Sequence, residues 1–162
     1  AQPVAETSEP TPEQQVVMAS IRDPLNPPEP IIAGRTAAAQ MAELFAERYG
    51  SYSTQGDYQN LRDLLPVMTA SYRSKTEAML ADAQSQQGQP YEGVTSAKVS
   101  TDVRVFSQAA GTAVIAVMLQ QQKTTATSTV SGYRSLRLEL KEESGGWKVD
   151  AVRWENDLTP AS

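Results

Sequence analysis

The chain has 162 residues, enough for one domain with a single hydrophobic core and a flanking segment. Its formal net charge of -5 argues against nucleic-acid binding, which requires clustered lysine and arginine. It contains neither cysteine nor histidine, which excludes disulfides, thiolate nucleophiles and triads built on imidazole. We therefore expect no cofactor and no metal.

The first 35 residues hold most of the chain's ten prolines and few large apolar residues. This composition predicts an extended, disordered linker over residues 1–35, followed by a folded domain over residues 36–158 and a short tail over residues 159–162. No apolar run is long enough to span a bilayer, and no signal peptide is present. We expect a membrane anchor upstream of this chain, with an ordinary cytosolic tail as the alternative.

Helical spacing begins at Thr36, a predicted N-cap. The helix that follows should end near residues 50–56, with an apolar stripe formed by Met41, Leu44, Phe45, Arg48 and Tyr52. A short second helix is predicted after Asp57, as its cap, and should end at Pro66. Its inward residues should be Tyr58, Leu61, Leu64 and Leu65.

A third helix is predicted from Ala70 to about Gln84, with Thr69 as its N-cap. The expected inner face consists of Tyr72, Thr76, Met79, Leu80 and Ala83.

After Gly93 the period changes to two, which indicates strands. The first strand should bury Val99, Thr101, Val103 and Val105. Residues 113–125 predict a long central strand, and a third strand should bury Leu136, Leu138 and Leu140. The polar stretch from Leu119 to Arg134 favours a solvated hairpin, with pairing to a partner as the alternative. The turn Glu143–Gly146 should close a hairpin onto a fourth strand.

That last strand, "WKVDAVRW", contains both tryptophans of the chain. Trp147 and Val149 share one parity, and Val152 and Trp154 share the other. A β-bulge between Ala151 and Val152 would place both tryptophans on the same side of a curved sheet. We therefore predict structural tryptophans that fill the concave face, in preference to a ligand box.

Three helices followed by a curved four-stranded antiparallel sheet constitute an α+β fold that resembles the nuclear transport factor 2-like (cystatin-like) superfamily. The matching motifs are the closing run Gly145–Val149 and the preceding Tyr133, Arg134, Leu136 and Leu138. Within that superfamily the chain is most similar to periplasmic domains of assembly factors from type IV secretion and conjugation systems, and to mammalian-cell-entry-associated proteins of mycobacteria.

The resemblance implies a non-catalytic extracytoplasmic scaffold, membrane-anchored upstream of this chain, in an envelope assembly. Its partners would be proteins of that complex, with a homo-oligomer as an open alternative. Neither nucleic acid nor direct membrane contact is implied.

Two alternatives stay open. The first is a module that binds a small apolar ligand in the cone between helices and sheet, and its ligand-binding residues would be Tyr52, Tyr72, Trp147 and Trp154. The second is an isomerase- or dehydratase-like enzyme, because this fold also hosts such activities. Its candidates are Tyr49, Tyr52, Tyr58, Tyr72, Asp57, Asp63, Asp102 and Asp150. Caps, solvated strand faces and core margins account for most of these, so we predict no catalytic residue.

Overall fold

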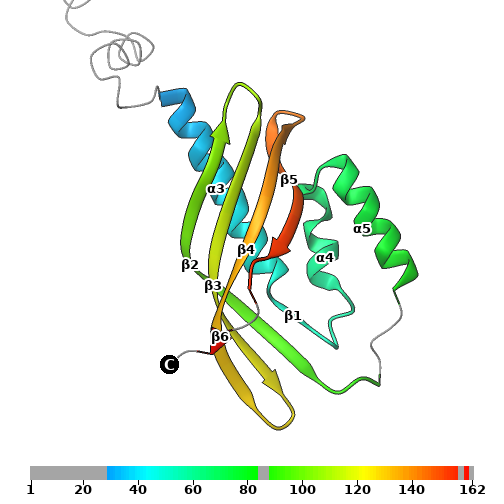
Figure 1. Ribbon diagram of the computed structural model, residues 1–162. Coiled ribbons are helices and arrows are strands. Elements are labelled where there is room, and N and C mark those ends of the chain that lie inside the picture. The colour runs from blue at the N-terminus through cyan, green and yellow to red at the C-terminus, as the bar shows by residue number, and fades with distance from the viewer. Residues whose placement is uncertain (1–28, 84–87, 157–158, 161–162) are drawn as a thin grey trace, which may run out of the picture. The chain divides into compact units, whose positions relative to one another are not determined.

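The structure, a computed structural model, describes residues 29–83, 88–156 and 159–160. The helical elements are α3 (Glu29–Tyr49), α4 (Gln59–Leu64), the 3₁₀ turn η1 (Leu65–Val67) and α5 (Ala70–Asp82). The strands are β1 (Tyr52–Ser53), β2 (Glu92–Ser107), β3 (Thr112–Thr125), β4 (Thr129–Glu143), β5 (Gly146–Trp154) and β6 (Thr159–Pro160). Figure 1 shows their succession along the chain.

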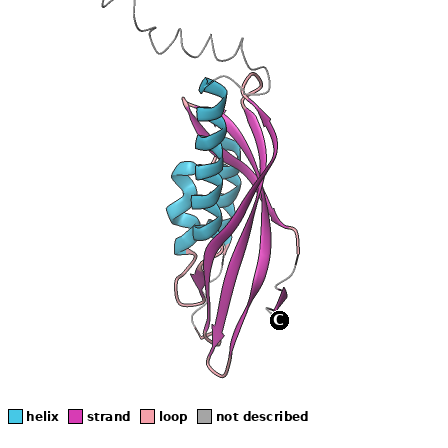
Figure 2. Cartoon of the chain, turned by 90° about the vertical axis from the view of Figure 1, so that its left-hand side faces the viewer, coloured by secondary structure: helices cyan, strands magenta, loops and turns pink. Residues whose placement is uncertain are grey.

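Within residues 37–160 the helices lie on one face of a curved antiparallel sheet (Figure 2). The strand order is β1-β2-β3-β4-β5, and β6 pairs with β4. The α+β prediction is therefore confirmed. The predicted four-strand count was too low, because the two-residue strands β1 and β6 extend the sheet and are too short to show a period. As a result, Thr159 and Pro160 of the predicted tail pair with Tyr133 and Gly132.

Helix α3 begins earlier than predicted and buries a different stripe. Thr36 lies inside the helix, because Pro30 is tolerated in a first turn that starts at Glu29. The remainder of the predicted linker, residues 1–28, lies outside the described residues. The buried positions are Ala38, Ala42, Phe45 and Ala46, whereas Leu44 is 56% exposed. The buried side of α3 is therefore formed by Phe45 and three alanines, and Met41 is partly buried against the same core.

The turn before α4 differs from the predicted cap. Asp57 and Tyr58 both have positive φ, 49° and 61°, and no side chain caps the helix. Before α5 the prediction is confirmed, because the Thr69 hydroxyl accepts a hydrogen bond from the Tyr72 backbone N–H at 3.2 Å. Met79, expected on the inner face of α5, is exposed.

Strand β2 contains two irregularities that overturn its predicted inner face. The register with β3 shifts between Lys98 and Ser100, and again between Val103 and Val105. Each extra residue turns the following side chains to the opposite face of the sheet. Val99 and Val105 are consequently more than half exposed, while Thr101 and Val103 are half-buried.

The bulge predicted in β5 is present, one residue earlier than expected. Glu139 pairs with Ala151 and Leu140 with Val149, which leaves Asp150 as the extra residue. Trp147 joins the hydrophobic core directly and Trp154 packs against it. The bulge therefore places both tryptophans on the helix-facing side, as the parity change indicated.

Candidate ligand-binding site

The four residues predicted to bind a ligand separate into two pairs. Tyr72 and Trp147 lie in the packed interior of the cone, whereas Tyr52 and Trp154 lie beside a pocket.

Around Trp147 the cone is filled by side chains. The Trp147 ring is 7% exposed and its centroid lies 5.5 Å from that of Phe106. The Tyr72 ring lies 6.3 Å from the fully buried Phe45, and burial raises the pKa of the Tyr72 hydroxyl. These contacts give Trp147 and Tyr72 structural roles, and neither of them lines a pocket described below.

A pocket of about 260 Å³ opens where α3 ends, next to Trp154. Its lining is mostly aromatic: Tyr49, Tyr52, Tyr58, Trp154, Leu61 and Asn60, with Ser53 at the edge. We call it the aromatic pocket. Tyr49 packs on Trp154 with ring centroids 5.9 Å apart, and the Arg134 guanidinium lies 3.9 Å from the Trp154 centroid. Burial raises the pKa of the Tyr49 hydroxyl.

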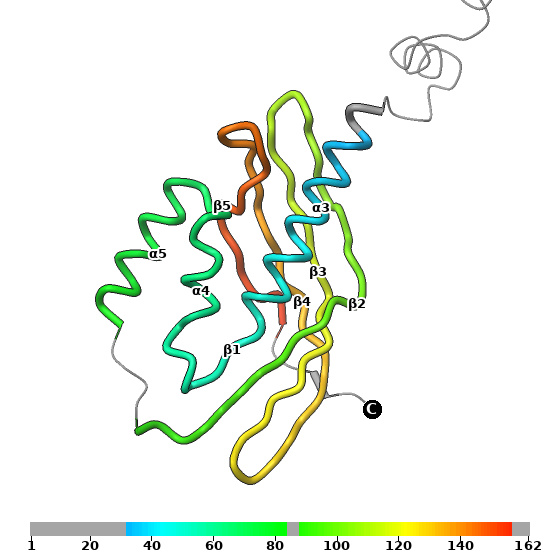
Figure 3. The backbone as a smooth tube through the Cα atoms, turned by 180° about the vertical axis from the view of Figure 1, so that it is seen from behind, coloured from blue at the N-terminus to red at the C-terminus, as the bar shows by residue number. Residues whose placement is uncertain are grey.

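The aromatic pocket is lined from two distant parts of the chain, the segment from α3 to α4 and the end of β5. Figure 3 shows the path of the backbone through these elements. Tyr49 is the last residue of α3, and the chain then turns at Gly50, whose carbonyl accepts a hydrogen bond from the Ser96 hydroxyl at 2.7 Å. An added Cβ at Gly50 would lie 2.6 Å from the Ser96 Oγ and 3.2 Å from the Ala46 carbonyl oxygen, so a larger residue would force neighbouring atoms to shift. The following strand β1 pairs with β2, Tyr52 opposite Val94, which fixes Tyr52 at the pocket edge.

A second pocket of about 340 Å³ adjoins the first. It shares Tyr52, Ser53 and Asn60 with the aromatic pocket, and we call it the polar pocket. Its other lining residues include Arg48, Gln59, Tyr91 and Gln122. The Asn60 amide donates to the Tyr49 carbonyl at 3.0 Å, which holds the shared wall in place.

The candidate catalytic carboxylates do not enter either pocket lining. Asp63 accepts hydrogen bonds from Gln59 and Arg48, and these bonds lower its pKa. Asp150 accepts from the Thr69 hydroxyl at 2.7 Å and pairs with Lys141 at 3.5 Å. Asp57 lies in the left-handed turn before α4. In the described part of the chain, no group of three or more acidic side chains could hold a metal ion.

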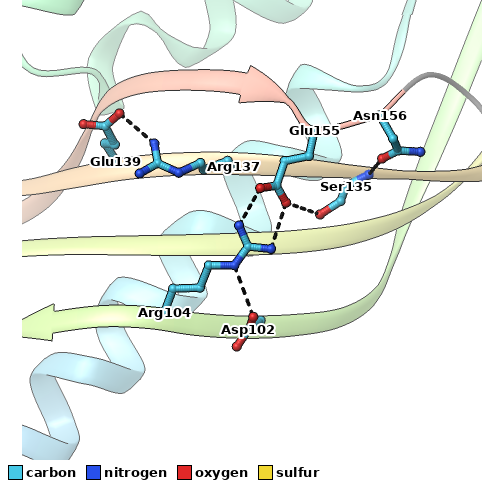
Figure 4. A network of polar contacts seen from close by, with 7 residues as sticks. All are labelled: Asp102, Arg104, Ser135, Arg137, Glu139, Glu155 and Asn156. Atoms are coloured by element: carbon cyan, nitrogen blue, oxygen red, sulfur yellow. Dashed lines mark hydrogen bonds and ion pairs between the residues drawn. The ribbon is translucent and has the colours of Figure 1, made fainter.

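The sheet face opposite the helices carries the remaining candidate, Asp102, in a polar network (Figure 4). Thr101 bonds to Glu43 of α3, so the neighbouring Asp102 points to the other, outer face. Arg104 bonds Asp102 at 3.2 Å and Glu155 at 2.9 Å, and thereby joins β2 to the end of β5. Glu155 also accepts from the Ser135 hydroxyl at 3.0 Å. Asp102 therefore serves a structural ion pair.

No model of a known protein family and no curated protein matches this sequence. Several solved structures do. The periplasmic domain of DotI aligns with a TM-score of 0.60 and 10% identity, over 75% of this chain and 95% of the other. An IcmL-like type IV secretion system protein from Legionella pneumophila aligns with a TM-score of 0.57 and 11% identity, over 79% and 94%. CagV, a VirB8 homolog of the type IV secretion system from Helicobacter pylori, aligns with a TM-score of 0.54 and 11% identity, over 76% and 99%.

A protein from Novosphingobium aromaticivorans, proposed to be an aromatic ring hydroxylase, also shares the fold, with a TM-score of 0.50 and 13% identity over 80% of this chain and 94% of the other. Among the described residues, no helix has the length and apolar character needed to cross a membrane. At these identities the comparisons establish fold. The chain has the nuclear transport factor 2-like fold, and it shares this fold with the periplasmic domain of DotI and with two type IV secretion system proteins.

Proposed function

We propose that this domain is a non-catalytic, extracytoplasmic scaffold that acts by contact with proteins of an envelope assembly of the secretion or conjugation type. The observation that carries the proposal is the shared fold with three type IV secretion components, one of them described as a periplasmic domain. A membrane anchor upstream of the linker would tether the domain, as in the architecture that the sequence resembles.

The geometry of the cone and the pockets supports a protein-binding role over a catalytic one. The cone is filled around Trp147, and neither pocket lining contains a carboxylate that could act with a tyrosine as an acid–base pair. On the outer face, Val105 is 53% exposed beside the network of Arg104 and Glu155. We infer that this outer face is the surface that contacts another protein.

The experiment is photo-crosslinking in the native cell, with the full-length gene expressed from its own start. A photo-reactive amino acid at Val105 reports on the outer face of the sheet. The matched control is Leu44, which is 56% exposed on α3. We expect the protein in the membrane fraction and crosslinks to envelope proteins from position 105 that exceed those from position 44.

Two results would contradict the proposal. Recovery of the full-length protein from the cytosol would overturn the extracytoplasmic location. Turnover of hydrolase or isomerase substrates by the purified domain, abolished by replacing a single Tyr or Asp, would overturn the non-catalytic role.

A second candidate function is the binding of a small apolar molecule. The observation in its favour is the aromatic pocket itself, which is open beside Trp154 and lined by Tyr52. Its volume of about 260 Å³ lies just below the range of roughly 300–1,000 Å³ for drug-sized ligand sites. A site of this size suits one ring or one side chain better than a larger cofactor.

A further inference from the structure

Aromatic residues gather at the corner where the two pockets meet. The chain has two tryptophans, six tyrosines and two phenylalanines. Four of the tyrosines and one tryptophan line the aromatic and polar pockets: Tyr49, Tyr52, Tyr58, Tyr91 and Trp154. Tyr52, which is 41% exposed, belongs to both linings and forms the ridge between them. The two pockets share Tyr52, Ser53 and Asn60, and we call them together the groove. Its accessible rings are those of Tyr52 and of Tyr91, which is 40% exposed, because Tyr49 and Trp154 pack on each other.

The aromatic side chains of this groove also carry unused hydrogen-bond donors. The hydroxyls of Tyr49, Tyr52 and Tyr58 and the indole N–H of Trp154 have no hydrogen-bond partner among the residues that the structure describes. Tyrosine and tryptophan at interfaces normally combine a ring contact with such a bond. The groove thus offers donors, beside apolar faces, to a ligand that brings acceptors.

Charge narrows the chemistry of that ligand. Neither pocket lining contains an aspartate or a glutamate, although the chain has 19 acidic residues. Two arginines lie at the groove: Arg134 covers Trp154, and Arg48 lines the polar pocket, where it is paired with Asp63. A cationic ligand would be repelled by Arg134 and would find no carboxylate in either lining. These charges favour a neutral ligand over a cationic one.

The turn that carries Tyr58 is conformationally unusual. Asp57 and Tyr58 are consecutive residues with left-handed backbone angles and neither is glycine. Such residues cost free energy and persist where the surrounding structure holds them, often at binding sites. Here the arrangement places the Tyr58 ring in the lining of the aromatic pocket.

We propose that this groove binds an extended, proline-containing peptide segment of a partner protein. Proline rings pack flat against tyrosine and tryptophan faces, and a proline residue has a carbonyl acceptor but no N–H donor. A polyproline II segment binds to aromatic rings and hydrogen-bond donors on a preformed surface, and this groove has both. The inference rests on the proposed contact function and specifies the chemistry of one partner.

The test is an NMR titration of the purified chain with a ten-residue polyproline peptide, and with a Gly-Ser peptide of equal length as the negative ligand. The two indole N–H signals report separately, because Trp154 lines the groove and Trp147 is in the core. We expect the polyproline peptide to shift the Trp154 signal and leave the Trp147 signal in place. The substitution Tyr52→Ala should weaken binding at least tenfold, which corresponds to about 1.4 kcal/mol.

The matched control is Tyr133→Ala, because Tyr133 on β4 is 38% exposed and lines neither pocket. It should bind the peptide as the unmodified chain does. The inference is overturned if the peptide causes no shift at millimolar concentration, if Tyr52→Ala binds unchanged, or if free indole shifts Trp154 while the peptide does not. The last result would favour the small-ligand function. If the protein binds the peptide but is recovered from the cytosol, only the proposed envelope function is overturned. If it crosslinks to envelope proteins but does not bind the peptide, only the peptide inference is overturned.

Discussion

Replacing Trp147 with alanine tests whether the closing tryptophans hold the fold together. The ring is 7% exposed, and an aromatic side chain of this size buries about 200 Å². At ~25 cal/mol per Å² this burial contributes about 5 kcal/mol, and a compact unfolded state reduces the figure by roughly 10–40%. The cavity left beside Phe106 adds to the loss, so we expect a destabilisation of about 3–5 kcal/mol.

The assay is urea unfolding followed by far-ultraviolet circular dichroism, since the substitution removes a fluorophore. In a thermal scan the same loss should lower Tm by about 10–20 °C for a domain of this size. Tyr133→Ala, at an exposed position, should change stability by less than about 0.5 kcal/mol. A loss below about 1 kcal/mol for Trp147→Ala would refute the core assignment. An unchanged Tm combined with loss of a partner would instead assign Trp147 to recognition.

Three further substitutions test individual contacts. Thr69→Ala removes the N-cap of α5 and should cost about 1–2 kcal/mol in urea unfolding, while Thr69→Ser should retain most of the stability. Gly50→Ala forces a close contact and should cost about 1–3 kcal/mol, whereas Gly146→Ala, whose added Cβ meets no atom within 4 Å, should be near neutral in the same assay. The Arg104 hydrogen bond lowers the pKa of Glu155, so its stabilisation is present above the unfolded pKa and is lost as the pH falls through the lower folded value. Tm measured from pH 6 to pH 2 should therefore fall less steeply for Glu155→Gln, and an unchanged slope would exclude this ion pair as a source of acid sensitivity.

The order of elements was predictable because local signals agree with the fold. The change from helical to alternating spacing after Gly93 coincides with the start of β2, and Thr69 caps α5. The predicted turn between β4 and β5 is present, and its residues Ser144 and Gly145 take positive φ. Each of these features depends on a few neighbouring residues, so it can be predicted from one sequence alone.

The errors lie where a distant segment decides the local structure. The alternating valines of β2 indicate one continuous face, but the bulges near Val99 and Val105 depend on how β2 fits the curvature of β3. In α3 the larger side chain of Leu44 was expected to be buried. The helix instead turns Phe45 and its alanines toward the core, and which residues face inward depends on how α3 packs on distant elements.

In the candidate site, a distant segment also decides the roles of two residues of one strand. Trp147 and Trp154 carry equivalent sequence signals, and the bulge at Asp150 points both to the helix side. Their roles separate because Trp147 meets Phe106 in the filled cone, whereas Trp154 lies where α3 ends at Tyr49 and the wall of the groove begins. The length of a helix from another part of the chain thus decides which tryptophan supports the core and which one is open to a ligand. Substitutions in β5 should accordingly affect stability at its start and binding at its end.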